Sequence, residues 1–227
     1  MISEIQFINL GFVNCYLVKT SEGFVLIDTG IRSKRDDLEK ALMNAGCKLG
    51  NLKLIIITHG DIDHSGNAAY LRDKFQTKIA MHRNDSVMVG EGRMIPRRKM
   101  KSPFLKLMFA LMRLSGGMKK TTARFERFKP DIYLEDGQSL QEYGLNAKVL
   151  HIAGHTKGSI GILTESGDLI AGDTLENRKT PRSAMIIENE AELSSSIDRL
   201  SNLNIKTVYP GHGKPFKWEQ FIVARMR

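Results

Sequence analysis

Hydrophobic and polar positions follow two kinds of pattern along the chain. Short apolar or alternating runs bounded by glycine or aspartate predict strands, and longer stretches with apolar residues three or four apart predict helices. The predicted strands are 2–8, 12–19, 24–27, 52–57, 78–81, 132–134, 148–152, 159–164, 169–171 and 206–209. The predicted helices are 32–45, 64–75, 103–115, 188–200 and 218–226.

The order of these elements predicts the fold class. The first three strands are separated by Gly11 and Gly23 and predict an antiparallel meander. Strands then come in two batches, each followed by helices, which is typical of two mixed sheets with helices outside. A length of 227 residues suits one large α/β (α+β) domain, so we expect residues 1–227 to form a single domain.

The residues that follow the largely apolar run 52–57 are unusually rich in ionisable side chains. His59, Asp61, Asp63 and His64 lie within six residues. Groups this close repel one another or compete for water unless a cation lies between them. The stretch therefore predicts a metal site.

Three further ligand candidates follow later predicted strands. His155, Asp173 and His212 each have glycine beside them, and glycine lets the backbone approach a crowded site closely. Four of the six histidines thus stand at strand ends. We interpret the other two, His82 and His151, as packed or edge residues and not as ligands.

Five motifs in sequence order carry a family resemblance. They are Asp-Thr-Gly at 28–30, the His-rich loop at 59–64, Gly-His-Thr-Lys-Gly-Ser at 154–159, Gly-Asp-Thr at 172–174 and Pro-Gly-His-Gly at 210–213. The chain resembles the metallo-β-lactamase-fold hydrolase superfamily over nearly its whole length. This resemblance implies a four-layer αββα sandwich of two mixed β-sheets.

The resemblance also implies a dinuclear metal site. One metal would take His59, Asp61 and His155, the second would take Asp63, His64 and His212, and Asp173 would bridge them. Asp28 would brace the site from behind without binding metal. Two divalent ions are implied, and we expect zinc first. The family usually has histidine where this chain has Asp61; its hard oxygen makes iron or manganese the alternatives.

The resemblance implies a metal-dependent hydrolase similar to the glyoxalase II and lactonase branches. Two cations about 3.5–4 Å apart share a water and lower its pKa, and the bridging hydroxide attacks an ester, thioester or lactone carbonyl. Asp63 is the expected catalytic residue, because it would orient or deprotonate the nucleophile. Two alternatives stay open: a nuclease or phosphodiesterase of the same fold, and an iron-dependent oxidoreductase of the same fold, which Asp61 favours.

Charge is concentrated in one segment. The chain has 34 Lys and Arg against 25 Asp and Glu, a net charge of +9. Residues 93–129 hold twelve of these bases, one acid and five of the eleven methionines, which leaves 22 bases and 24 acids elsewhere. This shift predicts a basic, Met-rich helical insertion in a nearly neutral body. Interleaved aromatic residues for stacking bases are few, which argues against nucleic acid as a partner.

The predicted helix 103–115 within this insertion is apolar on nearly every side. Three interpretations stay open: packing on its own domain or in a homodimer, contact with an anionic membrane surface, and a lid over the metal site. A lid would suit a small acyl or lactone substrate. Its candidate residues are Phe104, Leu107, Met108, Leu111 and Met112.

The compartment can also be predicted. Only two cysteines, Cys15 and Cys47, are present, which excludes a disulfide framework. The first residues lack a basic targeting region, and no run approaches the roughly 18 apolar residues of a membrane span. We expect a cytoplasmic protein, with peripheral membrane contact through the insertion as the alternative.

Overall fold

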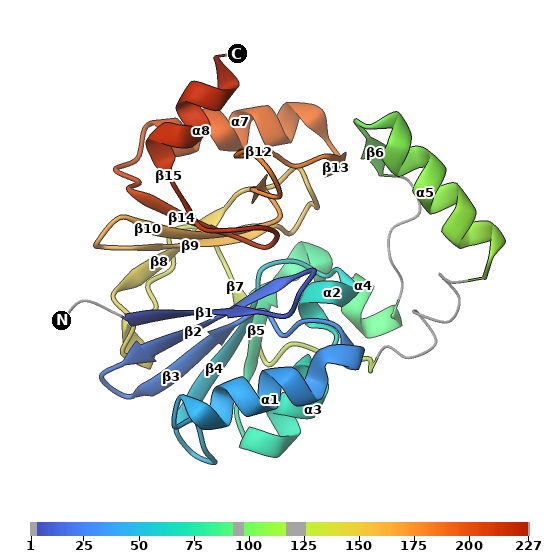
Figure 1. The fold of residues 1–227 in the computed structure, drawn as a ribbon. Helices are drawn as coiled ribbons and strands as arrows, with labels where there is room; N and C mark the ends of the chain where they lie inside the picture. The colour runs from blue at the N-terminus through green and yellow to red at the C-terminus, as the bar shows by residue number, and fades with distance from the viewer. Residues whose placement is uncertain (1–3, 93–97, 117–125, 227) are drawn as a thin grey trace.

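The protein consists of two β-sheets packed face to face, with helices on both outer sides (Figure 1). The computed structural model describes residues 4–92, 98–116 and 126–226. Its layers run helix, sheet, sheet, helix, so the predicted αββα sandwich is confirmed.

The first sheet combines an antiparallel half with a parallel half. Its strand order is β1-β2-β3-β4-β5-β7; the first three strands pair antiparallel, as the meander predicted, and the others pair parallel. Helices α1 and α3 cover its outer face (Figure 1). The bounds are β1 Glu4–Asn9, β2 Asn14–Thr20, β3 Gly23–Ile27, β4 Leu52–Ile57, β5 Ile79–His82, β7 Ile132–Leu134, α1 Arg35–Asn44, α2 Ile62–Ser65, α3 Ala68–Phe75 and α4 Ser86–Glu91.

The second sheet is also mixed and has the order β15-β14-β10-β9-β8. Only β10 and β14 pair parallel, and the other neighbours pair antiparallel. Helices α7 and α8 cover its outer face (Figure 1). The bounds are β8 Ala147–His151, β9 Ile160–Thr164, β10 Asp168–Gly172, β14 Thr207–Pro210, β15 Phe216–Lys217, α7 Glu190–Ser201 and α8 Trp218–Arg225. Two strands after β10, β11 Leu175–Glu176 and β12 Arg182–Ser183, form a separate two-stranded sheet, and β13 spans Ile186–Ile187.

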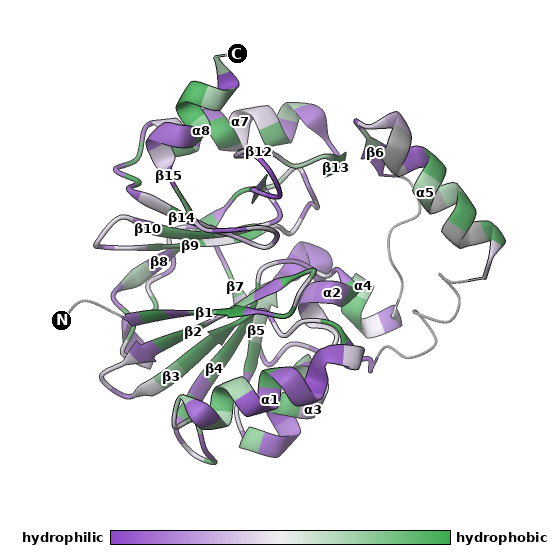
Figure 2. Ribbon diagram, in the orientation of Figure 1, coloured by the Kyte–Doolittle hydropathy of each residue, from purple (hydrophilic) through white to green (hydrophobic). Residues whose placement is uncertain are grey.

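Strand β4 shows why the sandwich is stable. Leu54 and Ile56 pack between the two sheets, whereas Ile55 and Ile57 pack against the layer of α1 and α3. All four side chains are fully buried. A strand buried on both faces needs a continuous apolar run, which is the pattern of residues 54–57, after the exposed Lys53. Figure 2 shows the same apolar character along the neighbouring strands.

The predicted helix 64–75 is wrong as a single element. The chain forms a short helix, α2, and restarts as α3 after Gly66 and Asn67. The Asn67 side chain donates hydrogen bonds to the carbonyl oxygens of Thr29 and Ile31, at 2.7 and 3.1 Å. A β-carbon on Gly66 would lie 2.8 Å from the carbonyl oxygen of Gly30, in the loop after β3. This close contact with the loop after β3 breaks the helix.

The insertion is joined to the body by a two-stranded ribbon. Strand β6 (Lys99–Met100) pairs antiparallel with β13, and helix α5 (Pro103–Leu114) follows it. Figure 1 shows α5 at the side of the molecule, away from α1 and α3. None of the helices in the described part of the chain has the length and apolar character needed to cross a bilayer.

Candidate metal centre

All the predicted ligands stand on loops or a helix start at one edge of the sandwich. The loop after β4 leads directly into α2, so two of the ionisable residues lie on the loop and two, Asp63 and His64, lie in the helix. The other three ligands follow β8, β10 and β14. Because β4, β10 and β14 end at this edge, residues far apart in the sequence meet there.

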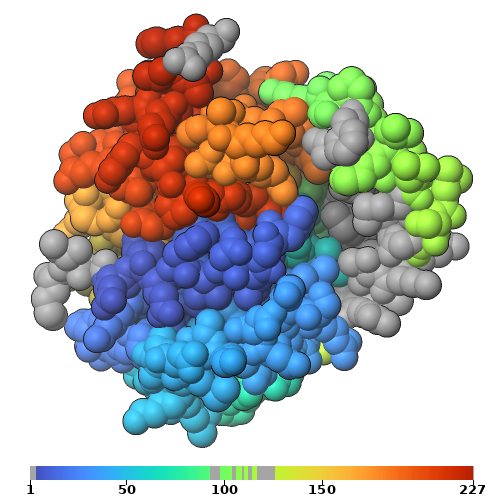
Figure 3. Space-filling view, viewed as in Figure 1, coloured from blue at the N-terminus to red at the C-terminus, as the bar shows by residue number. Residues whose placement is uncertain are grey.

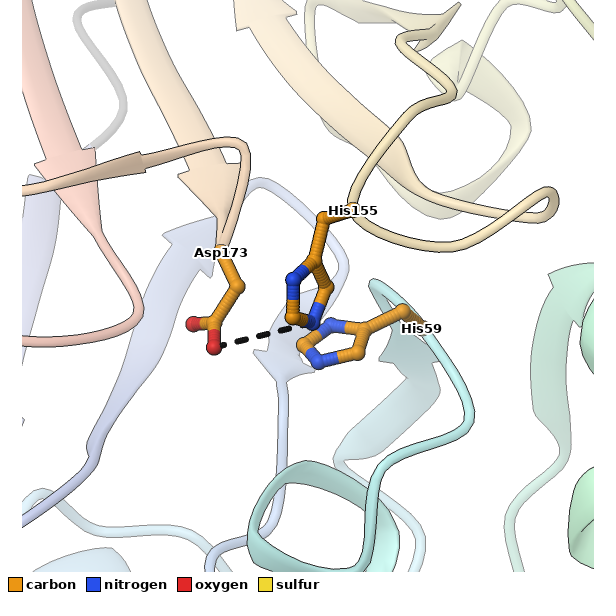
Figure 4. A group of neighbouring side chains, drawn as sticks. All are labelled: His59, His155 and Asp173. Atoms are coloured by element: carbon orange, nitrogen blue, oxygen red, sulfur yellow. Dashed lines mark ion pairs between the residues drawn. The ribbon is translucent and has the colours of Figure 1, made fainter. Parts of the chain in front are cut away.

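Two groups of three side chains meet at this edge. Each group has ligand atoms that lie within 4.8 Å of one another, as a metal ion requires. Figure 4 shows the first group, in which three side chains converge from three loops. The groups are His59, His155 and Asp173, and Asp63, His64 and His212.

Asp173 lies between the two groups. Its carboxylate oxygens are 3.2 Å from His64 Nε2, 3.1 Å from His212 Nε2 and 3.8 Å from His155 Nε2. A β-carbon on Gly211 would lie 2.2 Å from the Asp173 Oδ1 atom, so this position has room only for glycine. The position of Asp173 is the one that the resemblance assigns to a bridging ligand.

The histidines present the same ring nitrogen to the centre. His155 Nδ1 donates to the carbonyl oxygen of Ile186 at 2.6 Å, and His212 Nδ1 donates to that of Phe12 at 2.6 Å. With Nδ1 protonated, Nε2 is the free acceptor and faces the carboxylates. Such partners fix the tautomer that a metal requires.

Asp28 orients the ligands from behind. It accepts a hydrogen bond from His64 Nδ1 at 2.7 Å and bonds from the Thr58 amide and hydroxyl at 2.8 Å each. The Thr58 hydroxyl lies 3.1 Å from His59 Nδ1. Asp28 has a left-handed backbone, with φ of 60°, which is strained for a residue with a β-carbon. The structure thus places Asp28 against a ligand candidate and outside the two groups.

The donor set fits divalent ions. His59 Nε2, His64 Nε2 and Asp173 Oδ1 are buried and have no hydrogen-bond partner among the described residues. Burial acts to lower the histidine pKa values, but the carboxylates, Asp173 first, raise the pKa of His64 well above its usual value and that of His212 to about 10. The centre therefore favours positive charge, and a cation that supplies it displaces those protons.

Asp61 differs from the other predicted ligands. Its Oδ2 atom is 3.2 Å from His155 Nε2 and 3.5 Å from His59 Nε2, but it also forms a close ion pair with Arg98. Burial acts to raise the pKa of Asp61, and Arg98 with the two histidines outweighs it and holds the pKa well below its usual range. Asp61 belongs to neither group of three.

Sequence reasoning missed Asp85. Its buried carboxylate accepts bonds from Gly60 N at 2.9 Å, Thr156 Oγ1 at 2.8 Å and Gly158 N at 2.8 Å. Gly60 adjoins His59, and Thr156 adjoins His155. Asp85 therefore joins the two loops that carry these histidines. It lies in a polar stretch after β5 with no local signal of this role.

The predicted lid residues are only partly described. The side chains of Phe104 and Met112 lie outside the described part of the chain. Leu107, Met108 and Leu111 are exposed, so packing on their own domain is wrong for these three side chains.

Comparison with known proteins places this geometry in a family. A family model of the metallo-beta-lactamase superfamily matches residues 8–212. The chain is 24% identical to the "Beta-lactamase-like protein 2 homolog" of Caenorhabditis elegans, over 94% of this chain and only 62% of that protein. It is 26% identical to the "Hydroxyacylglutathione hydrolase GloC" of Haemophilus influenzae, over 72% of this chain and 69% of that protein.

Solved structures share the fold. The metallo-beta-lactamase family protein TTHA1429 of Thermus thermophilus superposes with a TM-score of 0.74 at 24% identity, covering 99% of this chain and 78% of that one. TTHA1623 in a di-iron-bound form gives 0.63 at 25% identity, covering 90% and 89%. The di-zinc enzyme LRA-12 from an Alaskan soil metagenome gives 0.67 at 19% identity, covering 92% and 76%. The chain belongs to the metallo-beta-lactamase superfamily.

Proposed function

We propose that the protein is a metal-dependent hydrolase that cleaves an ester, thioester or lactone carbonyl. One observation carries the proposal: four histidine Nε2 atoms and the carboxylates of Asp63 and Asp173 form two adjacent groups with ligand spacing. The hydroxyacylglutathione hydrolase among the relatives supports an acyl substrate.

Each of the two groups would hold a divalent ion, and Asp173 lies within reach of the histidines of both groups. When bound, such ions supply a hydroxide at neutral pH and polarise the reacting oxygen. The chain holds the centre by fixing each ring through Nδ1, which leaves Nε2 as the ligand. Asp28 and Asp85 keep the loops in place from behind.

Asp63 is the proposed catalytic residue. It is the most exposed of the predicted ligands, at 20%, and its Oδ2 atom lies 3.4 Å from His212 Nε2. A carboxylate at the open side of the centre can accept a proton from the attacking water and pass it to the leaving group. Asp63 therefore both holds a ligand position and moves a proton.

Zinc is the proposed ion, because imidazole nitrogen and carboxylate oxygen both suit it. Iron or manganese is the alternative, since Asp61 would add a hard oxygen. Metal analysis of the purified protein separates these proposals. Two zinc or manganese ions per chain with esterase activity support hydrolysis, whereas stoichiometric iron with an absorption band supports an oxidoreductase.

Substituting Asp63 tests the proposal directly. In Asp63→Ala, thioester hydrolysis should fall by about 10²–10⁴-fold, the usual contribution of a positioned acid–base group. The melting temperature should stay unchanged, because the side chain is not part of the core. The matched control is Asp73→Ala, an exposed carboxylate that pairs with its neighbour Arg72. Full turnover in Asp63→Ala, or in metal-stripped protein, contradicts the proposal.

Helix α5 carries two further proposals. Its exposed apolar side chains suit a homodimer contact or contact with an anionic membrane surface. Sedimentation of the protein alone, and with anionic vesicles at low salt, distinguishes the two. A protein that sediments as a monomer and does not bind the vesicles would contradict both proposals.

A further inference from the structure

Arg98 is held at the metal centre by the ribbon of β6 and β13. Ile187 pairs with Lys99, directly after Arg98, and Ile186 pairs with Met100. The carbonyl oxygen of Ile186 also accepts the bond from His155 Nδ1. One short strand therefore orients a ligand candidate and fixes the position of Arg98.

The Arg98 guanidinium is buried against Asp61. Their side chains are only 6% and 7% exposed. Nη1 donates to Asp61 Oδ2, which itself lies 3.2 Å from His155 Nε2. The guanidinium thus lies one carboxylate away from the predicted ligands.

Two of the three Arg98 guanidinium nitrogens have no hydrogen-bond partner in the described part of the chain. These two atoms, Nε and Nη2, are buried. A buried donor without an acceptor is costly, and the cost is greater for a charged group. The Asp61 carboxylate balances the charge of Arg98 but accepts a hydrogen bond from only one of its nitrogens, Nη1. The remaining donors form a fork that suits two oxygens of one anion.

Arg98 also lines a basic cavity. Its volume is about 390 Å³, and its lining includes four bases, Arg98, Lys99, Lys101 and Lys106, with one acid, Glu190. Glu190 pairs with Lys101 at 3.3 Å, so the cavity keeps an excess of positive charge. Such a lining attracts an anionic oxygen group. Leu107, Met108 and Leu111 do not line this cavity.

We propose that this cavity and the Arg98 fork bind a carboxylate or phosphate on the substrate, so that the enzyme selects anionic thioesters or esters. The inference rests on the proposed hydrolase function and names its substrate class. Arg98 acts as a specificity residue, because it connects the cavity to the metal centre through Asp61. Neutralising Asp61 uses Nη1 and leaves Nε and Nη2 without an acceptor among the described residues.

Three thioesters with a common acetyl group test the inference. They are S-acetyl-N-acetylcysteamine, which is neutral, S-acetyl-3-mercaptopropionate, which carries a carboxylate, and S-acetyl-2-mercaptoethyl phosphate. The metal-loaded protein should hydrolyse at least one anionic thioester with a higher kcat/KM than the neutral one. The better anion identifies the group that the cavity binds.

Two variants separate charge from hydrogen bonding. Arg98→Gln should lower kcat/KM for the preferred anionic thioester by about 10- to 100-fold, the range of a hydrogen bond to a charged group, mainly through KM. Arg98→Lys keeps a positive charge beside Asp61 but removes the fork, so it should also lose most of the preference. The quantity compared is the ratio of kcat/KM for the anionic thioester to that for the neutral one, because any effect of the lost Asp61 pair on the metal centre lowers both and cancels in this ratio.

Controls keep the outcomes distinct. Arg127→Gln removes the same charge from an exposed position in the same insertion and should leave the preference intact. Metal content and melting temperature are measured for every variant. Equal losses on neutral and anionic thioesters, or full preference in Arg98→Lys, overturn the inference while hydrolysis stands. Failure of the wild type to hydrolyse any of the three overturns the proposed function and the inference with it.

Discussion

The four-layer body and helix α5 place similar side chains in opposite surroundings. In β4, Ile56 is fully buried between the sheets, whereas in α5 Leu107, Leu111 and Leu114 are 57–84% exposed. Figure 3 shows the described part of α5 at the margin of the surface. The body is held by packing on two faces, whereas the stretch that leads into α5 is held by the ribbon of β6 and β13 and by the ion pairs of Arg98 with Asp61 and of Lys101 with Glu190. Apolar side chains therefore stabilise the body, where they are buried, whereas on α5 they form an exposed apolar surface.

The largest test of this difference is a pair of truncations. Ile56→Ala should lower the free energy of unfolding by about 2–5 kcal/mol, because it opens a cavity between the sheets. Leu111→Ala should change it by less than about 0.5 kcal/mol, since its side chain is exposed. Urea unfolding of both variants measures the difference. A large cost in Leu111→Ala would show that α5 is buried in solution, and its dependence on protein concentration would identify a dimer.

A second test concerns the polar contacts that hold the edge of the body. Asp85→Asn should cost about 1–3 kcal/mol, because the amide nitrogen would face backbone or hydroxyl donors that the carboxylate now accepts. Metal affinity should fall too, since the loops of His59 and His155 lose their connection. Thermal unfolding with metal titration measures both, and Asp73→Asn is the exposed control. If the metal affinity were unchanged, Asp85 would contribute to the stability of the fold but not to metal binding.

The smallest effect is expected at an exposed ion pair of the body. Asp136 accepts two bonds from Arg199, at 2.9 Å each, and one from the His151 amide at 2.8 Å. Partial burial acts to raise the pKa of Asp136, but Arg199 and the amide outweigh it and lower the pKa. Its contribution is thus present above the unfolded pKa, about 3.9, and is lost as pH falls through the folded pKa.

Asp136→Asn should therefore destabilise the protein by less than about 1 kcal/mol at pH 7, because exposed pairs are screened by solvent. The difference from wild type should shrink below pH 4. Urea unfolding at several pH values measures it. A difference that grows toward low pH would contradict this assignment of charge.

Elements with a strong local signal could be predicted from the sequence. The run 52–57 has the bounds of β4, because residues 54–57 are buried on both faces and only Lys53, near its start, is polar and exposed. The helix 64–75 failed because tertiary bonds from Asn67 interrupt it. The strands β6 and β13 have two residues each and carry no periodicity. Their pairing depends on contacts between distant segments.

The candidate site divides in the same way. Motif order predicted the six residues of the two groups, because the loops that carry them lie at strand ends. Arg98 is one of twelve bases in the segment 93–129, and nothing local distinguishes it from the rest. Asp85 likewise resembles any polar loop residue. Both acquire their roles only when the chain folds, and whether Asp61 binds metal stays a prediction.

The register of β6 against β13 determines which sequence changes would disturb the metal centre and which would not. Side chains alternate between the faces of a strand, so a slip of one residue would turn Arg98 away from Asp61. Helix α5 begins beyond this ribbon, at Pro103, and no such alternation restrains it. Insertions and substitutions in α5 can thus alter what the protein meets at its surface while the catalytic edge keeps its geometry. Related proteins can therefore differ in the partner or substrate that they bind while they keep the same arrangement of metal ligands.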